Sequence, residues 1–226
     1  MMRAARALLL LLGLLLAPTL VSGQPSGPGA IATPSLWHIK GDPRKGLAGE
    51  VYLFGSVHVL PPGLKWQSRP IRRGLTRSDV YVFEVPQDEK SVAELQGLIQ
   101  ARGYLPAGQS LRALLRPEAR ADLDAALAAA ALPENAVDQA RPWLASIQLM
   151  FAQMTKLHYG ADNGVESVFA DMAARKHKQT RYLETIAEQF ALLAPDDDKL
   201  ELEEFEAGLK DLSDIGSELE PMIRAW

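Results

Sequence analysis

The sequence predicts an α+β protein, with a small mixed β-sheet near its start and a mostly helical remainder. Two runs, residues 51–60 and 79–85, are rich in β-branched and aromatic residues, the types favoured in strands. Both runs are continuously apolar rather than alternating, which is typical of strands covered on both faces. After residue 86, apolar residues recur at the three- and four-residue spacing of helices.

The two strand-like runs are predicted to form a parallel β-α-β unit. The segment between them has room for a crossover, with a short helix over residues 68–77. The first run stops at Gly55 and places His58 just beyond its end, whereas the second ends at Glu84. Parallel strands end at the same edge of a sheet, where ligands bind in open α/β proteins. His58 and Glu84 are therefore expected to lie close together.

The remaining elements follow from local patterns. Residues 35–40 are predicted to form a hairpin with the first run, and residues 180–184 a further short strand. Helices are expected over residues 92–103, 117–132, 142–160, 164–174, 185–195 and 196–219. The last helix is amphipathic, with an acidic face expected to be solvated. Its apolar stripe, Leu202 to Leu219, needs a cover, so self-association or a partner is expected there.

Composition excludes several classes of function. The formal net charge is −4 and no basic stripe is present, so no nucleic-acid binding is expected. The chain has no cysteine, which excludes disulfides, thiolate metal sites and a cysteine nucleophile. The glycine-rich phosphate loops, H-E-x-x-H and G-x-S-x-G are absent as well.

The N-terminus reads as a signal peptide over residues 1–23. Arg3 and Arg6 precede the apolar run Leu8 to Leu16, and small residues precede the predicted cleavage after Gly23. The alternative is an uncleaved anchor, but the apolar run is shorter than the roughly 20 residues of a spanning helix. Residues 24–34 read as a linker. We therefore expect an exported protein without a stable membrane span, periplasmic if the source is Gram-negative and otherwise secreted.

Three ionisable residues follow predicted strands and are candidates for chemistry: His58, Glu84 and Glu184. Imidazole with carboxylates suits a divalent metal ion, with His58 and Glu84 as ligands and Glu84 or Glu184 as a catalytic acid or base. The alternatives are structural. His58 could satisfy a strand end by hydrogen bonding, and either glutamate could be a salt-bridged or helix-capping residue.

The chain resembles the TraB/GumN family, which includes the Tiki proteases. The resemblance rests on several motifs: Leu36-Trp37-His38-Ile39, the G-x-x-H motif Gly55-Ser56-Val57-His58, Ser78 to Glu84, Arg141-Pro142-Trp143-Leu144, Gly164-Val165-Glu166, and Tyr182-Leu183-Glu184-Thr185. It covers residues 35–226, and it implies an α+β fold with a site at the G-x-x-H strand end. It also implies a metal-dependent, protease-like hydrolase that acts on a peptide or other small substrate.

Two positions depart from the family pattern. Glu166 stands where the family usually has aspartate, and this longer side chain can still hydrogen-bond. The family's second G-x-x-H motif near the C-terminus is not found, so the domain is expected to be C-terminally incomplete. The alternatives are therefore a non-catalytic binding or regulatory protein, or a fragment of a longer chain.

Overall fold

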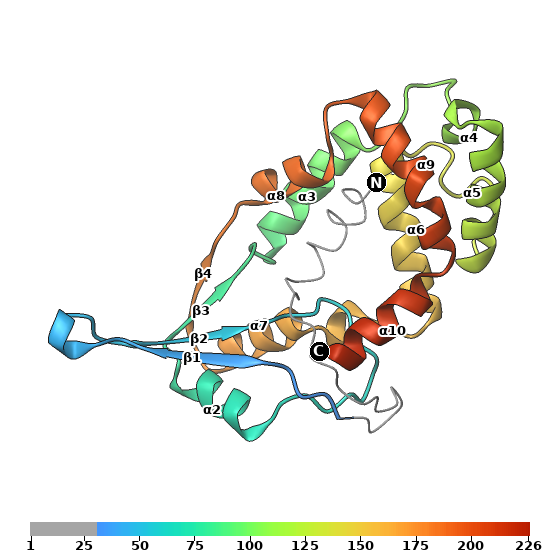
Figure 1. Ribbon diagram of the computed structural model, residues 1–226. Coiled ribbons are helices and arrows are strands. Elements are labelled where there is room, and N and C mark those ends of the chain that lie inside the picture. Colours follow the sequence, from blue (N-terminus) through green and yellow to red (C-terminus); the bar gives the residue numbers. More distant parts are fainter. Residues whose placement is uncertain (1–30) are drawn as a thin grey trace. The chain divides into compact units, whose positions relative to one another are not determined.

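The computed structural model describes residues 31–226 (Figure 1). These residues divide into two compact units. The hairpin unit comprises residues 31–82, 159–181 and 220–226, and the helical unit comprises residues 83–158 and 182–219. The predicted signal peptide lies outside the described residues. Part of the predicted linker is attached to the fold, because Ile31 forms a parallel bridge with Lys65.

The hairpin unit begins with the predicted hairpin. Strands β1 (Leu36–Lys40) and β2 (Glu50–Phe54) pair antiparallel, with Trp37 opposite Leu53. A 3-10 helix, η1 (Pro43–Lys45), forms the turn, and the side chain of Asp42 caps it. One face of the hairpin contacts α2 (Arg69–Arg77), because the Tyr52 ring lies against Gly74. The α2 prediction is confirmed.

An ion-pair cluster ties the hairpin to the end of α2. The carboxylate of Glu50 pairs with His38 at 3.0 Å and with Arg77 at 3.0 Å, and it accepts a hydrogen bond from Tyr52. Desolvation acts to raise the pKa of Glu50, but the hydrogen bonds from His38 and Tyr52 and the charge of Arg77 lower it below its ordinary value. The cluster lies on the side of the hairpin that faces α2.

Strand pairing differs from the prediction. β3 (Val80–Phe83) pairs in parallel with β4 (Gln179–Tyr182), and β2 pairs only with β1 among the described strands. The α+β class with a parallel strand pair is confirmed. The predicted pairing of residues 51–60 with residues 79–85 is wrong, as is the expectation that both faces of β2 are covered. Val51 and Leu53 are about half exposed instead.

The helical unit contains α3 (Glu89–Arg102), α4 (Leu111–Leu114), α5 (Pro117–Ala129), α6 (Pro142–Lys156), α8 (Ile186–Leu193) and α9 (Asp198–Ser213). Helix α9 packs on α5 and α6, and α3 packs on α8. The core between these helices is aliphatic, with fully buried Leu123, Leu127, Leu149 and Leu209. The long tail helix of the prediction is in fact two helices, α9 and α10 (Ile215–Ala225), and α10 crosses from one unit to the other.

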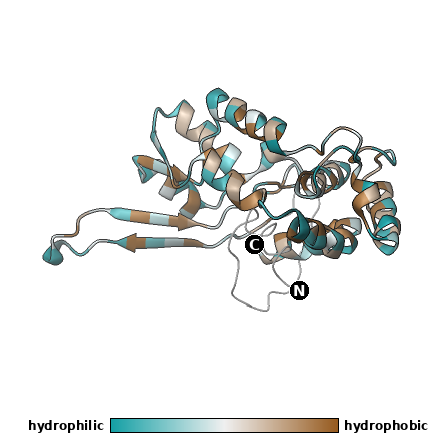
Figure 2. Ribbon diagram, turned by 90° about the horizontal axis from the view of Figure 1, so that it is seen from above, coloured by the Kyte–Doolittle hydropathy of each residue, from teal (hydrophilic) through white to brown (hydrophobic). Residues whose placement is uncertain are grey.

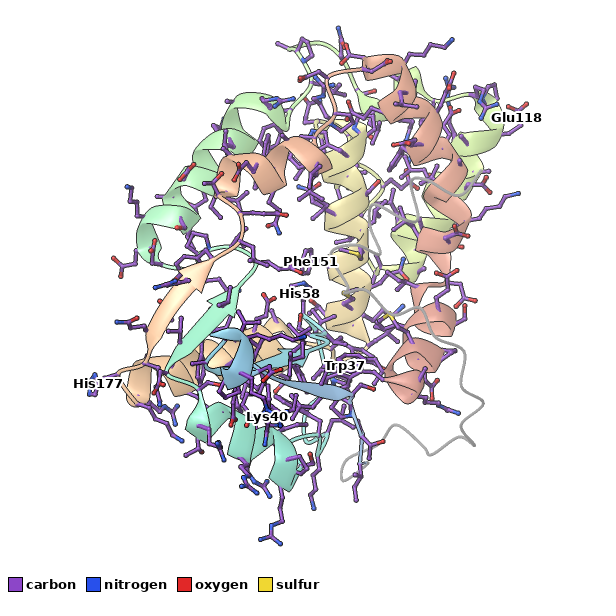
Figure 3. All side chains as sticks on the ribbon, turned by 60° about the vertical axis from the view of Figure 1, so that its left-hand side comes forward. Trp37, Lys40, His58, Glu118, Phe151 and His177 are labelled. Carbon is purple, nitrogen blue, oxygen red and sulfur yellow. The ribbon has the colours of Figure 1, made fainter. Side chains whose placement is uncertain are left out.

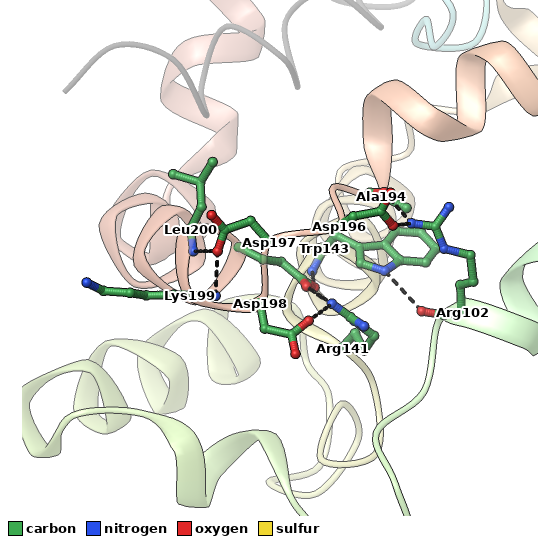
Figure 4. A network of polar contacts seen from close by, with 10 residues as sticks. Arg102, Arg141, Trp143, Ala194, Asp196, Asp197, Asp198, Lys199 and Leu200 are labelled. Carbon is green, nitrogen blue, oxygen red and sulfur yellow. Dashed lines mark hydrogen bonds and ion pairs between the residues drawn. The ribbon is translucent and has the colours of Figure 1, made fainter.

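The acidic face of α9 is not simply solvated, contrary to the prediction. Buried Glu201 pairs with Arg141 and accepts a hydrogen bond from the backbone N–H of Trp143 at 3.0 Å (Figure 4 shows the Arg141 and Trp143 contacts). Buried Glu206 pairs with the side chain of Arg116 and accepts a hydrogen bond from the backbone N–H of the same residue at 2.8 Å. Each carboxylate thus caps the first turn of a helix that begins with Arg-Pro.

The apolar stripe of the predicted tail helix packs against other helices of the helical unit. Phe205, Leu209 and Leu212 are buried, and α9 contacts α5 and α6. The expectation of self-association or a partner rested on this stripe, and it stays a prediction. Among the described residues, no helix is both long enough and apolar enough to span a membrane.

Candidate functional site

The G-x-x-H segment forms a loop in the hairpin unit, directly after β2. Val57 and Leu60 are fully buried and anchor the loop in the core. The backbone N–H of Leu60 donates to Gly160, and the N–H of Val165 donates to Val57 at 3.0 Å. These contacts bring residues 160–165, which lead into α7 (Val165–Arg175), against the loop that carries His58.

A close approach of two backbones fixes this arrangement. The Cα of Gly164 lies so near the His58 carbonyl that a Cβ added there would be 2.0 Å from the carbonyl oxygen. Any side chain at position 164 would therefore push the loop and α7 apart. Gly164 is also the N-cap residue of α7, which places Glu166 in the first turn of the helix.

His58 and Glu166 form the centre of the site. The Nδ1 atom of His58 lies 3.2 Å from a carboxylate oxygen of Glu166, and the Ser56 hydroxyl donates to the other oxygen at 3.4 Å. The Glu166 side chain is 9% exposed, and that of His58 is 25% exposed (His58 is labelled in Figure 3). The positive end of the α7 dipole stabilises the buried carboxylate.

This geometry suits a histidine that binds a cation or moves a proton. A carboxylate at Nδ1 fixes the tautomer and the ring orientation, so the lone pair is directed to Nε2. Imidazole nitrogen is a donor for divalent first-row metals, so Nε2 can bind such an ion while Glu166 orients the ring.

Aromatic side chains support the loop from its other end. The indole N–H of Trp226 donates to the Gly55 carbonyl at 2.8 Å. The Trp226 ring packs against Phe54 and Trp66, which both contact Phe169 of α7. This cluster connects the end of β2, the loop and α7, so the position of His58 depends on packing as well as on hydrogen bonds.

The other predicted site residues lie in the helical unit. Glu84 directly follows β3 and is half-buried, and its carbonyl accepts hydrogen bonds from Leu183 and Glu184. The Glu184 side chain is exposed and precedes Thr185, which caps α8 in a capping box with Glu188. Glu84 and Glu184 are thus brought together through their backbones, and the meeting of His58 with Glu84 stays a prediction.

Sequence reasoning did not assign a role to Glu166 or Trp226. The sequence does contain a feature that indicates Glu166: it is an acidic residue in the first turn of a predicted helix, within the motif Gly164-Val165-Glu166. The pattern predicted a helix there and left the carboxylate as a possible hydrogen-bonding group. Nothing in the local sequence around Trp226 indicates that its indole reaches Gly55.

The comparisons with known proteins agree with the resemblance. The sequence model of the TraB/PrgY/gumN family matches residues 35–226 of the chain. Neither the curated proteins nor the solved structures contain a match. The matched range contains the G-x-x-H loop, Glu166 and the residues that hold them in place.

Proposed function

The chain belongs to the TraB/PrgY/gumN family, and we propose that it is an exported, metal-dependent hydrolase that acts on a peptide or other small substrate. The observation that supports this most is the pairing of His58 with buried Glu166 at 3.2 Å. A buried carboxylate next to an imidazole is costly to desolvate, and such pairs are concentrated at functional sites.

The residues of the hairpin unit would hold a divalent cation at His58. The imidazole would bind it through Nε2, while Glu166 holds the ring by one carboxylate oxygen near Nδ1. Ser56 donates to the other Glu166 oxygen and orients the carboxylate. A bound cation of this kind supplies a Lewis acid and makes water nucleophilic at neutral pH.

Glu84 would be a further ligand or the general base. It directly follows β3. As a base, its carboxylate would accept a proton from the attacking water and later return it to the leaving group. Glu184 would contribute by holding the Glu84 carbonyl with its backbone N–H at 2.9 Å.

Export is part of the proposal. The N-terminal pattern of Arg3, Arg6 and an apolar run supports a cleaved signal peptide, with a periplasmic location in a Gram-negative source and secretion otherwise. The mass of the chain recovered from an exporting host tests this. A mature N-terminus at Gln24 is expected, and an intact Met1 on the recovered protein would contradict it.

The first experiment measures metal content and peptide hydrolysis together. We expect bound divalent metal in the wild-type protein, loss of metal in His58→Ala, and loss of most activity in Glu84→Gln, by at least about a hundredfold. The matched control is His177→Asn, an exposed histidine with φ of 51°, a conformation that asparagine tolerates. Equal metal retention in all four proteins would refute the proposal.

The second candidate function is a non-catalytic binding or regulatory protein with the same metal site. Metal bound through His58 without hydrolysis of any peptide substrate would favour this alternative.

A further inference from the structure

The hairpin exposes an apolar face that the rest of the hairpin unit does not cover. Two cross-strand pairs, Trp37 with Leu53 and Ile39 with Val51, lie on one side of the hairpin. Each of the four side chains is between 50% and 53% exposed. We call these four residues the outward face. Exposed apolar patches of this kind mark binding surfaces on soluble proteins.

The opposite side of the hairpin is the one that packs. The Tyr52 ring lies on Gly74 of α2, and Phe54 joins the aromatic cluster with Trp66. Successive side chains on a strand point to opposite sides. The outward face is therefore directed away from α2, and local packing within this unit does not bury it.

The tip of the hairpin is cationic. Lys40, Arg44 and Lys45 are exposed at the turn, which is hydrophilic in Figure 2, and Leu47 beside them is 60% exposed. The nearest acidic residues have other roles, since Asp42 caps the turn and Glu50 pairs with Arg77 (Trp37 and Lys40 are labelled in Figure 3). The hairpin unit as a whole carries 13 Lys and Arg against 7 Asp and Glu.

The area of the outward face argues against a stable complex with a second copy. Even at about 250 Å² for each side chain, four half-exposed residues offer at most about 500 Å². Stable protein interfaces bury roughly 800 Å² on each partner. A bilayer surface has no such minimum, because a few apolar residues with adjacent cations are enough for reversible binding.

We propose that the hairpin is a membrane-docking element that binds the surface of an anionic bilayer. The outward face enters the boundary between headgroups and acyl chains, where tryptophan is favoured. Arg44 and Lys45 of the turn contact the anionic headgroups, and Lys40, whose side chain alternates to the other side of β1, adds positive charge nearby. Each cation near the surface contributes about a fivefold increase in partitioning. The inference does not depend on the metal site, so each can fail without the other.

The experiment measures partitioning of the purified, signal-free protein into vesicles of phosphatidylcholine with about 30% phosphatidylglycerol, and into vesicles of phosphatidylcholine alone. We expect at least about tenfold stronger partitioning into the anionic vesicles, and weaker binding as salt is raised. Trp37 is a suitable reporter because Trp66, Trp143 and Trp226 are buried. Its emission should be quenched by brominated acyl chains.

Two variants test the two halves of the proposal. Trp37→Ser with Leu53→Ser removes half of the outward face, and the triple change of Lys40, Arg44 and Lys45 to Gln removes the cationic tip. Each should weaken partitioning at least about tenfold. Thermal unfolding identifies a variant that fails to fold, and in that case the triple Gln variant and the lipid quenching of Trp37 still decide the question.

Matched controls lie elsewhere on the molecule. The triple change of Lys65, Arg69 and Arg73 to Gln removes exposed charge near and on α2, and Leu192→Ser removes an exposed leucine of α8. Both should bind within about twofold of wild type. Equal binding to the two vesicle types, or equal losses in the controls, would overturn the proposal. Lipid-independent self-association that Trp37→Ser with Leu53→Ser abolishes would assign the face to a second copy instead.

Discussion

At the scale of single residues, the site depends on the close contact of Gly164 with His58. The glycine allows the backbone of the α7 N-terminus to touch the loop carbonyl, and this contact brings Glu166 to the imidazole. Ser56 and Trp226 then fix the carboxylate and the loop by single hydrogen bonds. The side chains of His58 and Glu166 are thus oriented by these neighbours.

Gly164→Ala should separate the loop from α7. The new Cβ would meet the His58 carbonyl at 2.0 Å, and the backbone must move to relieve the clash. We expect a loss of about 1–3 kcal/mol in the free energy of unfolding, as for other overpacked sites, together with weaker metal binding. Chemical denaturation measures the first and dialysis against metal the second.

The control for this change is Gly97→Ala. Gly97 lies in α3, where an added Cβ meets no atom within 4 Å, and alanine is the better helix former. That variant should be as stable as wild type or slightly more so. If Gly164→Ala behaves in the same way, the close contact is not what positions the site.

The sequence predicted one of the two central residues of this site, His58, but not Glu166. His58 was expected because a glycine ends the strand that precedes it, and this is local information. Glu166 was not assigned because Ser56 and Glu166 are 110 positions apart, and their contact depends on a backbone approach that no local pattern encodes. The indole of Trp226 meets Gly55 across an even longer separation of 171 positions.

At the scale of elements, α9 caps the N-termini of α5 and α6. Glu201 and Glu206 each accept a backbone N–H at the start of a helix and pair with the arginine that precedes its proline. Hydrogen bonding with Glu201 raises the pKa of Arg141 above its ordinary value, despite the opposing effect of desolvation. Both contacts replace the side-chain caps that α5 and α6 lack.

Glu201→Ala should destabilise the helical unit strongly. The change removes the cap at the N-terminus of α6 and the carboxylate that pairs with Arg141. We therefore expect a loss of about 2–4 kcal/mol in the free energy of unfolding. Glu203→Ala is the control, because Glu203 is exposed on the same helix and should change stability by less than about 0.5 kcal/mol. Equal effects in urea denaturation would show that the cap is not important.

Local patterns predicted most elements but not all of their partners. The hairpin, α2 and the helices from α5 to α7 were expected near their observed positions, because each depends on neighbouring residues. Strand β3 pairs with β4, which is about 100 positions away in the sequence. The sequence predicted pairing with the nearer β2, and that prediction was wrong. The helical period identified the acidic face of α9, but it could not reveal that Glu201 and Glu206 meet arginines.

At the scale of the whole molecule, charge is divided between the two units. The helical unit carries 9 Lys and Arg against 21 Asp and Glu, whereas the hairpin unit has an excess of positive charge. The modest total of −4 conceals this division. The unit with the G-x-x-H loop is therefore the one suited to approach an anionic surface.

The central claim is that His58, oriented by Glu166, holds a divalent metal ion. The most direct measurement is calorimetric titration of the metal-free protein with zinc and with manganese, for wild type and for Glu166→Gln. The predicted result is one ion per chain, with affinity about 10- to 100-fold weaker in Glu166→Gln. Equal affinity in the two proteins, or no binding to either, would contradict the account.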